Sequence, residues 1–329
     1  MKIPFAFSLM LALCLRLFSL VQAQPHDYQQ FVPGGALVAE FHLQERCYGM
    51  SVVPMGDYIY LLGGDTPPDA VGNIERINTR TNTIETLDAH IWPRYFSCSA
   101  AVGEKIYIFG GTKNVNPFWG RYKFGQCFDT RTHKVTDLAD APSVLCMASA
   151  VEFQGKIYVV SAGETTLWIY DPQSDKWEKG ATMRVERRCD VVLKDGVIYA
   201  IGGFTYPGGF RDSLVNGSML RPTKACEAYD IAKNQWHDLP DLPVETSAHH
   251  LALAGDSIFA FGDYTDMDRI LRFDLKTQTW RRLFFTGFDA RYFPSACAVN
   301  NRIYVMGGKL REEGYYLDEV QVFDAAKLR

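Results

Sequence analysis

The sequence VIYAIGG at residues 197–203, followed by AYDIAKNQW at residues 228–236, decides the fold. In the first segment the apolar residues end in two glycines, which is typical of a short strand that leads into a tight turn. In the second segment an aromatic–Asp pair precedes a tryptophan, which offers a large apolar area to a neighbouring sheet. The two segments predict three of the four short strands of one structural unit. The fourth is the apolar run that comes before the first segment.

The same pattern recurs along the chain, and it fixes how many units we expect. Its strand-and-turn part is found at YIYLLGG (58–64), KIYIFGG (105–111), KIYVVSAG (156–163), VIYAIGG (197–203), SIFAFGD (257–263) and RIYVMGG (302–308). Its second part is found at ERINTRTNTI (75–84), CFDTRTHKV (127–135), IYDPQSDKW (169–177), AYDIAKNQW (228–236), RFDLKTQTW (272–280) and VFDAAKLR (322–329). Self-similarity at this period predicts an array of six small sheets.

These motifs resemble the Kelch repeat family, whose repeats form the blades of β-propellers. The resemblance covers residues 40–329 and implies an all-β fold, a six-bladed Kelch-type β-propeller over residues 36–329. The chain departs from the family pattern at Ala162, interpreted as replacing the first glycine of unit three, and at Asp263, the second glycine of unit five. Units one and two lack the tryptophan. We expect local distortion in these blades and an unchanged fold.

The two ends of the repeat region predict how the ring closes. Unit six stops after its third strand, at Phe323 and Asp324, whereas residues 36–43 (ALVAEFHL) have the character of a fourth strand. Pairing this N-terminal strand with the last unit would complete the sixth blade and hide an edge that is otherwise free to aggregate.

The first 23 residues predict a secretory signal peptide. Lys2 is followed by an apolar run at 3–15, and small residues precede Gln24, although Arg16 interrupts the apolar character. We expect residues 24–35 to be a lead-in and the protein to be secreted or extracytoplasmic, periplasmic if bacterial. The alternatives are a lipid anchor at Cys14 and an uncleaved segment on a cytoplasmic protein. No later span of about 20 apolar residues predicts a membrane helix.

Charge and cysteine spacing exclude several classes of partner and cofactor. The chain has 34 basic and 38 acidic residues, whereas nucleic-acid binding requires a basic field. The cysteines show no CxxC spacing, so neither a metal site nor a cofactor is predicted. Several cysteines fall near the first strand of a unit, where we expect them to fill the interior as small apolar residues.

Arginines and histidines recur just before the first strand of the units. Because neighbouring strands are antiparallel, this position shares one face of the disc with the connection between the second and third strands. The residues are Arg46, Arg94, Arg188 and Arg291, with His249 and His250 in unit five. A ring of guanidinium groups would favour carboxylate, sulfate or phosphate groups, as the acidic-peptide sites of Kelch adaptor proteins imply. Alternatively, the arginines pair with nearby loops and cap the blades.

Two long connections on the same face carry aromatic residues. Residues 112–125 contain Phe118 and Trp119, and residues 204–224 contain Tyr206 and Phe210. Aromatic side chains in long loops are typical of contact surfaces, although they can also fold down over the disc. The second connection also holds an N-glycosylation sequon at Asn216.

The sequence therefore favours a non-catalytic binding module. We expect a monomer that presents its arginine- and aromatic-bearing face to a protein or acidic peptide, or to a glycan, with no nucleic acid as partner. No catalytic motif was found. The alternative is a secreted carbohydrate-active propeller resembling sialic acid epimerases. The acid–base candidates for that reaction are Glu164, Asp190, His249, His250 and Asp263.

Overall fold

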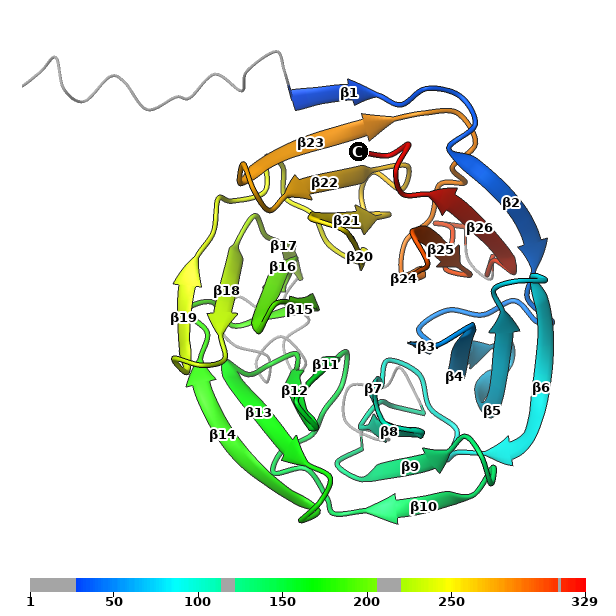
Figure 1. The fold of residues 1–329 in the computed structure, drawn as a ribbon, viewed down its shortest axis with the longest axis vertical. Coiled ribbons are helices and arrows are strands. Elements are labelled where there is room, and N and C mark those ends of the chain that lie inside the picture. The colour runs from blue at the N-terminus through cyan, green and yellow to red at the C-terminus, as the bar shows by residue number, and fades with distance from the viewer. Residues whose placement is uncertain (1–27, 114–121, 206–219, 313–314) are drawn as a thin grey trace, which may run out of the picture.

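The computed structural model describes residues 28–113, 122–205, 220–312 and 315–329, and these form a six-bladed β-propeller (Figure 1). The predicted all-β Kelch-type architecture is confirmed. The predicted signal peptide, residues 1–23, lies outside the described residues. So do Phe118, Trp119, Tyr206, Phe210 and Asn216. In the described ranges, no helix has the length and apolar character needed to cross a membrane.

Each blade is an antiparallel sheet of four strands that runs from the axis to the rim. Blade 1 contains β3 (Ser51–Met55), β4 (Tyr58–Thr66), β5 (Asp69–Asn78) and β6 (Thr83–His90). Blade 2 contains β7 (Cys98–Val102), β8 (Lys105–Phe109), β9 (Gly125–Asp129) and β10 (Val135–Leu138). Blade 3 contains β11 (Ser149–Phe153), β12 (Lys156–Val160), β13 (Thr166–Asp171) and β14 (Lys176–Thr182). Blade 4 contains β15 (Arg187–Lys194), β16 (Val197–Thr205), β18 (Cys226–Asp230) and β19 (Gln235–Asp238), and the short strand β17 (Arg221–Pro222) pairs with β16. Blade 5 contains β20 (His250–Ala254), β21 (Ser257–Phe261), β22 (Ile270–Asp274) and β23 (Thr279–Phe284).

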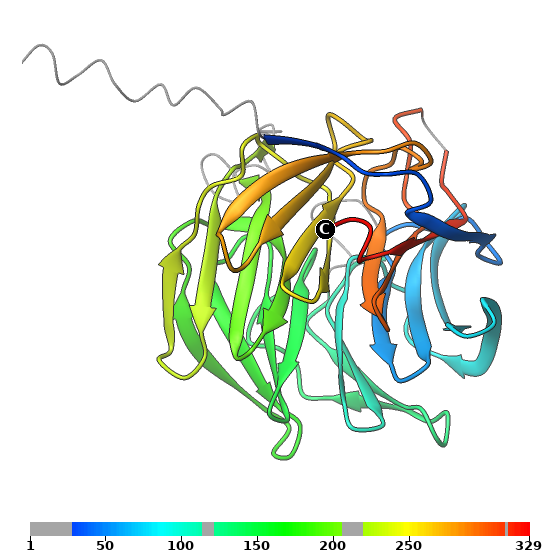
Figure 2. The same ribbon diagram turned by 45° about the horizontal axis from the view of Figure 1, so that its top comes forward.

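Blade 6 is built from both ends of the chain, as predicted. Its strands are β24 (Ser295–Val299), β25 (Arg302–Met306), β26 (Glu319–Asp324) and the N-terminal β2 (Leu37–His42). The closing strand β2 runs antiparallel to β26, with Leu37 opposite Phe323 and His42 opposite Glu319. Closure thus covers the edge of β26, and Figure 2 shows β2 lying along the last blade.

The lead-in contributes a strand that the sequence did not predict. Residues of β1 (Gln29–Phe31) pair in parallel with β23 and add a fifth strand to blade 5. Val32 and Ala36 follow it and are buried. Three residues are too short to show an alternating pattern, so only the fold reveals this strand. The N-terminal segment therefore spans blades 5 and 6.

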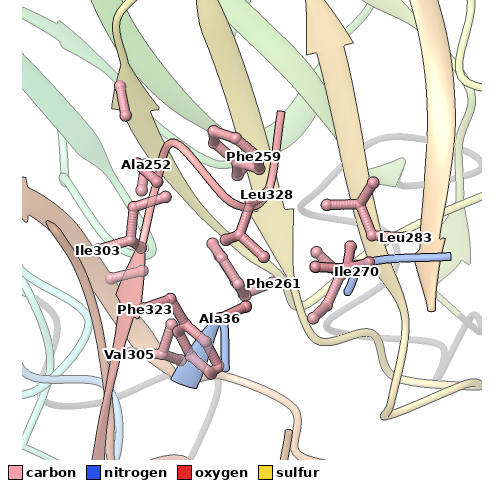
Figure 3. Packing of buried hydrophobic residues seen from close by; sticks show 14 residues of the cluster. Ala36, Ala252, Phe259, Phe261, Ile270, Leu283, Ile303, Val305, Phe323 and Leu328 are labelled. Atoms are coloured by element: carbon pink, nitrogen blue, oxygen red, sulfur yellow. The ribbon is translucent and has the colours of Figure 1, made fainter. Parts of the chain in front are cut away.

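The hydrophobic core is divided among the six interfaces between neighbouring blades. Figure 3 shows the interface of blades 5 and 6, where Phe261 and Phe323 stack with ring centroids 5.9 Å apart. Ala36 and Leu328 join this cluster, so both ends of the described chain are held there. Burial of apolar surface contributes about 25 cal/mol per Å² to the free energy of folding, and it is the main contribution that holds the blades together.

The glycine pair is required because another chain segment lies against it. A Cβ atom on Gly110, whose φ is 64°, would lie 1.9 Å from the carbonyl oxygen of Leu145. In blade 3 the pairing of Ser149 with Val160 shows that Ser161 and Ala162 occupy the two glycine positions. The interpretation of Ala162 as the first glycine was therefore wrong by one residue.

Candidate functional site

One face of the disc, which we call the loop face, carries two sets of connections. The first set joins second to third strands, and its described parts are 67–68, 110–113, 122–124, 161–165, 220–225, 262–269, 307–312 and 315–318. The second set joins neighbouring blades and comprises 43–50, 91–97, 139–148, 183–186, 239–249 and 285–294. Isolated backbone bridges link the two sets, as between Tyr95 and Thr112 or Tyr292 and Lys309. The expected meeting of these segments on one face is therefore observed.

Two of the four predicted arginines lie in the interior and not on this face. Arg94 is fully buried, and its guanidinium donates to the carbonyl of Gly110 and to the Gln126 side chain at 3.0 and 2.8 Å. Burial lowers the pKa of Arg94 to about 10. Arg291 is also fully buried and donates to the carbonyl of Gly307 at 3.0 Å. These side chains hold the glycine turns of blades 2 and 6, so a ring of exposed guanidinium groups is not formed.

The third member of this internal set is Arg187. It is fully buried, pairs with the Glu227 carboxylate, and donates to the carbonyls of Gly202 and Ala200, each at 3.1 Å. Arg187, and not Arg188, is therefore the counterpart of Arg94. The two adjacent arginines could not be separated from the sequence because their order depends on a β-bulge in β15.

Arg188 lies at the axis, within a ring of six equivalent residues that we call the axial ring. Its members are Gly49, Phe96, Met147, Arg188, Ala248 and Phe293. Phe96 and Phe293 have φ angles of 56° and 52°, which are uncommon for bulky residues. Hydrogen bonds between blades hold this backbone, including Phe96 N to Gly49 O and Phe293 N to Ala248 O, both 2.7 Å.

The Arg188 guanidinium lies among aromatic rings. Its carbon atom is 4.4 Å from the centroid of Phe293 and 4.8 Å from that of Phe96, within the range of cation–π attraction. Further ring contacts extend outward from these two residues. The connected set, which we call the aromatic plate, is Tyr48, Tyr95, Phe96, Phe204, Tyr264, Tyr292, Phe293 and Tyr316. Arg188 is therefore a half-buried cation held rigidly at the centre of the loop face.

Below Arg188 is a small chamber of about 60 Å³ that contains Asp190 and His250. The Asp190 carboxylate accepts from the Ser149 hydroxyl and, at 2.6 Å, from the Leu251 amide, so it joins blades 3, 4 and 5. His250 Nδ1 lies 3.2 Å from the same carboxylate. In a Ser–His–Asp hydrolase the histidine stands between the other two residues. Here the aspartate stands between Ser149 and His250, so these three residues do not have the order of that triad.

His249 lies against this chamber and is buried, with Nε2 3.2 Å from the carbonyl oxygen of Ile201. Desolvation lowers the pKa of His249 to about 4, against the opposing effect of Asp190 and Asp263. The folded protein therefore keeps this imidazole neutral over a range in which the unfolded chain binds a proton.

This difference predicts a pH-dependent stability. Between pH 6.5 and pH 4 the unfolded state binds the extra proton, so the free energy of unfolding should fall by about 3 kcal/mol. Urea unfolding at intervals of half a pH unit measures it. His249→Gln should flatten the curve in that window. If the free energy of unfolding of the variant falls with pH as steeply as that of the wild type, groups other than His249 cause the loss of stability.

The remaining predicted residues have separate places. Arg46 is exposed on the connection between β2 and β3. The Glu164 carboxylate accepts from the Trp168 indole at 2.7 Å, and Asp263 is fully buried against Arg269 at 3.1 Å. The seven cysteines in the described part are buried and form no disulfide, in agreement with a space-filling role. Burial raises the pKa of the Cys98 thiol to about 12.

Exposed apolar side chains are concentrated on the loop face. Among the described residues, the large exposed ones on this face are Trp92, Val144, Leu220, Tyr264 and Tyr315. The two others, Phe31 and Val38, belong to β1 and β2. The sequence analysis missed Trp92, Tyr264 and Tyr315. Trp92 could have been noticed because it stands outside the position of the tryptophan in the repeat. Tyr264 lies in the connection 262–269, which the sequence analysis did not single out.

The family model of the Kelch motif matches residues 46–83, 93–142, 187–243 and 290–327. The chain belongs to the Kelch-repeat family. The matches cover blades 1, 2, 4 and 6. Blades 3 and 5 of this Kelch-repeat chain, where the glycine pair is altered, lie between the matches and keep the same strand order.

Curated relatives share the repeat region. The chain is similar to Kelch-like protein terF of Aspergillus terreus, at 26% identity over 265 residues, which cover 73% of this chain and 56% of the relative. It is also similar to Kelch repeat and BTB domain-containing protein 6 of Homo sapiens, at 26% identity, covering 52% of this chain and 23% of the relative. Kelch repeat and BTB domain-containing protein 8 of Xenopus tropicalis is 32% identical, over 44% of this chain and 25% of the relative. The matched part of the chain thus spans between 23% and 56% of these relatives' length.

Proposed function

We propose that this protein is a non-catalytic binding module whose loop face binds an acidic segment of a partner protein. The observation that carries the proposal is the gathering of exposed aromatic and aliphatic side chains on one face, around the cation Arg188. Clusters of exposed aromatic residues around a rigid charged group are typical of binding hot spots.

Arg188 supplies the charge for this contact. Phe96 and Phe293 hold its guanidinium in place, so little rotamer entropy is lost when a ligand binds. A planar guanidinium can meet both oxygens of one carboxylate, which favours aspartate or glutamate in the partner. Lys309 lies on the same face, 4.9 Å from the ring of Tyr48, and adds positive charge beside the aromatic plate.

Trp92 and Tyr264 supply the apolar anchors. They are 59% and 48% exposed, which is unusual for side chains of this size. They lie on connections of different blades, so a ligand that touches both must lie across the disc. An extended peptide or a projecting loop of a protein has this shape.

The geometry favours binding over catalysis by an epimerase-like site. The chamber beneath Arg188 is about 60 Å³, and the adjoining axial cavity, which shares Asp190 and His250, is about 300 Å³, at the lower end of the range of about 300–1,000 Å³ for small-molecule pockets. Its one carboxylate, Asp190, already accepts hydrogen bonds from two neighbouring blades. A carboxylate committed in this way is poorly suited to moving a substrate proton.

Selection from a displayed library of random 12-residue peptides tests the proposal. Peptides recovered on the wild-type chain should be enriched in Asp or Glu beside apolar residues. Arg188→Ala should weaken their binding by more than about tenfold, and Trp92→Ala by three- to tenfold. The readout is the dissociation constant by fluorescence anisotropy, with the melting temperature measured in parallel.

Arg131→Ala is the matched control, because Arg131 is an exposed arginine on a turn of the opposite face, paired with Glu104 at 3.2 Å. It should leave the affinity unchanged. Selected peptides without acidic residues, or peptides that bind Arg188→Ala as tightly as the wild type, would contradict the proposal. Loss of binding in Arg131→Ala alone would move the site to the other face.

A further inference from the structure

The ring-closing strand brings together three metal-ligating side chains that are far apart in the sequence. His42 ends β2, Asp318 directly precedes β26, and Glu319 begins β26. One ligand atom from each lies within 4.8 Å of the others. The cluster therefore lies across the seam that closes the propeller, at the rim of blade 6 seen in Figure 1.

The backbone at this seam is fixed by hydrogen bonds. His42 and Glu319 are register partners across β2 and β26. The carbonyl of Asp318 accepts from the Leu43 amide at 2.7 Å, and that of Glu319 accepts from Arg291 at 3.2 Å. The three Cα positions are thus set by the fold, so little order has to be created when an ion binds.

The side chains themselves do not satisfy one another. His42 Nδ1 and Asp318 Oδ1 are 3.7 Å apart, which is too long for a hydrogen bond. The Oε2 atom of Glu319 is buried and accepts no hydrogen bond from the residues that the structure describes. A buried carboxylate oxygen without a donor is costly, and a cation would satisfy it.

The surrounding charge also favours a cation. Glu40 lies two residues before His42 on the same face of β2, and its carboxylate accepts from Gln321 at 3.2 Å. Asp289 lies close to Glu40 and Glu319, and the buried guanidinium of Arg291 lies 3.6 Å from the Asp289 carboxylate. Four carboxylates and one guanidinium therefore surround the imidazole, and the negative charges exceed the positive one; the carboxylates belong to Glu40, Asp289, Asp318 and Glu319, and the guanidinium to Arg291.

We propose that His42, Asp318 and Glu319 form a site for a divalent transition-metal ion, with zinc as the representative ion, that clasps the N-terminal strand to blade 6. One imidazole and two carboxylates suit zinc, and the imidazole disfavours calcium and magnesium. Water would complete the coordination, since His42 is 61% exposed. The bound ion would join β2 to β26 directly.

Blade 1 provides an internal comparison for this site. His90 ends β6 as His42 ends β2, and it lies opposite Asn73. The Ile91 amide donates to the carbonyl of Gly72 at 2.9 Å, just as the Leu43 amide donates to the carbonyl of Asp318. The backbone is therefore matched, but Gly72 and Asn73 replace the two carboxylates. His90 should not bind zinc.

Zinc titration of the tag-free, EDTA-treated chain tests the proposal. Isothermal titration calorimetry with zinc chloride should give one saturable site per chain, and zinc should raise the melting temperature. His42→Gln and Asp318→Asn should each lower the affinity at least tenfold, whereas His90→Gln should bind as the wild type does. His42 is exposed, so its variant should keep the wild-type melting temperature without zinc.

Two results would overturn the proposal. The first is a wild-type chain with no saturable zinc site and no change in melting temperature. The second is a site whose affinity is the same in His42→Gln as in the wild type, or is lost in His90→Gln instead. Either result would be independent of peptide binding at the loop face.

Discussion

Replacing Arg187 with methionine is expected to lower the free energy of unfolding by about 3–5 kcal/mol. Arg187 and Glu227 form a fully buried ion pair, with side chains 0% and 1% exposed. The variant leaves the Glu227 carboxylate buried without its counter-charge. It also removes the hydrogen bonds that Arg187 donates to the carbonyls of Gly202 and Ala200. Urea unfolding followed by tryptophan fluorescence measures the change.

Blade 2 offers the matched variant. Arg94 has the same place and the same burial, but its side-chain partner is the neutral Gln126. Arg94→Met should therefore cost less, about 1–3 kcal/mol, because no charge is left behind. Adding Glu227→Gln to Arg187→Met should recover part of the loss for the same reason. Equal costs for Arg94→Met and Arg187→Met would show that the lost backbone contacts, and not the charge, decide the effect.

Removing the closing strand is expected to have the largest effect of all. A chain that begins at Gln44 lacks β1 and β2, and with them the buried residues Val32, Ala36 and Leu43. The edge of β26 and one side of two inter-blade clusters would be exposed. This loss is comparable with the ~5–15 kcal/mol of net stability that a whole domain has. We expect no cooperative thermal transition and a strong tendency to aggregate.

Two shorter truncations separate the contributions. A chain that begins at Gln24 keeps every described strand and should melt as the full chain does. A chain that begins at Gly34 keeps β2 but loses β1. Because β1 forms only three residue pairs with β23, its loss should lower the free energy of unfolding less than the loss of β2 does. It should melt cooperatively at a lower temperature. Circular dichroism and size-exclusion chromatography give the comparison. A folded, monomeric chain starting at Gln44 would contradict the role assigned to β2.

The binding-site residues show where sequence reasoning stops. For Arg94 and Arg291 the sequence left two interpretations open, because arginine at the start of a strand is compatible with either an exposed rim or a buried cap. The choice depends on whether backbone carbonyls surround the guanidinium, and Gly110 and Gly307 provide them. The sequence also did not distinguish the buried role of Arg187 from the axial role of Arg188, since a β-bulge shifts the register by one residue. Of the predicted arginines, only Arg188 lies at the axis of the loop face.

The metal cluster illustrates the same limit over a longer range. The sequence predicted no metal site, because its cysteines do not have the close spacing that is typical of metal ligands. His42 and Glu319 become neighbours only when β2 pairs with β26. Nothing in the local sequence of either residue carries this information.

The sequence by itself determined the number of blades, the order of strands within each and the closure by residues from both ends. These features depend on short-range alternation and on the glycine pair, which act within a few residues. The tertiary structure alone decided which arginines are buried, which aromatic residues are exposed and which side chains meet at the seam. These outcomes depend on contacts between blades, where a one-residue shift of register exchanges an interior side chain for a surface one.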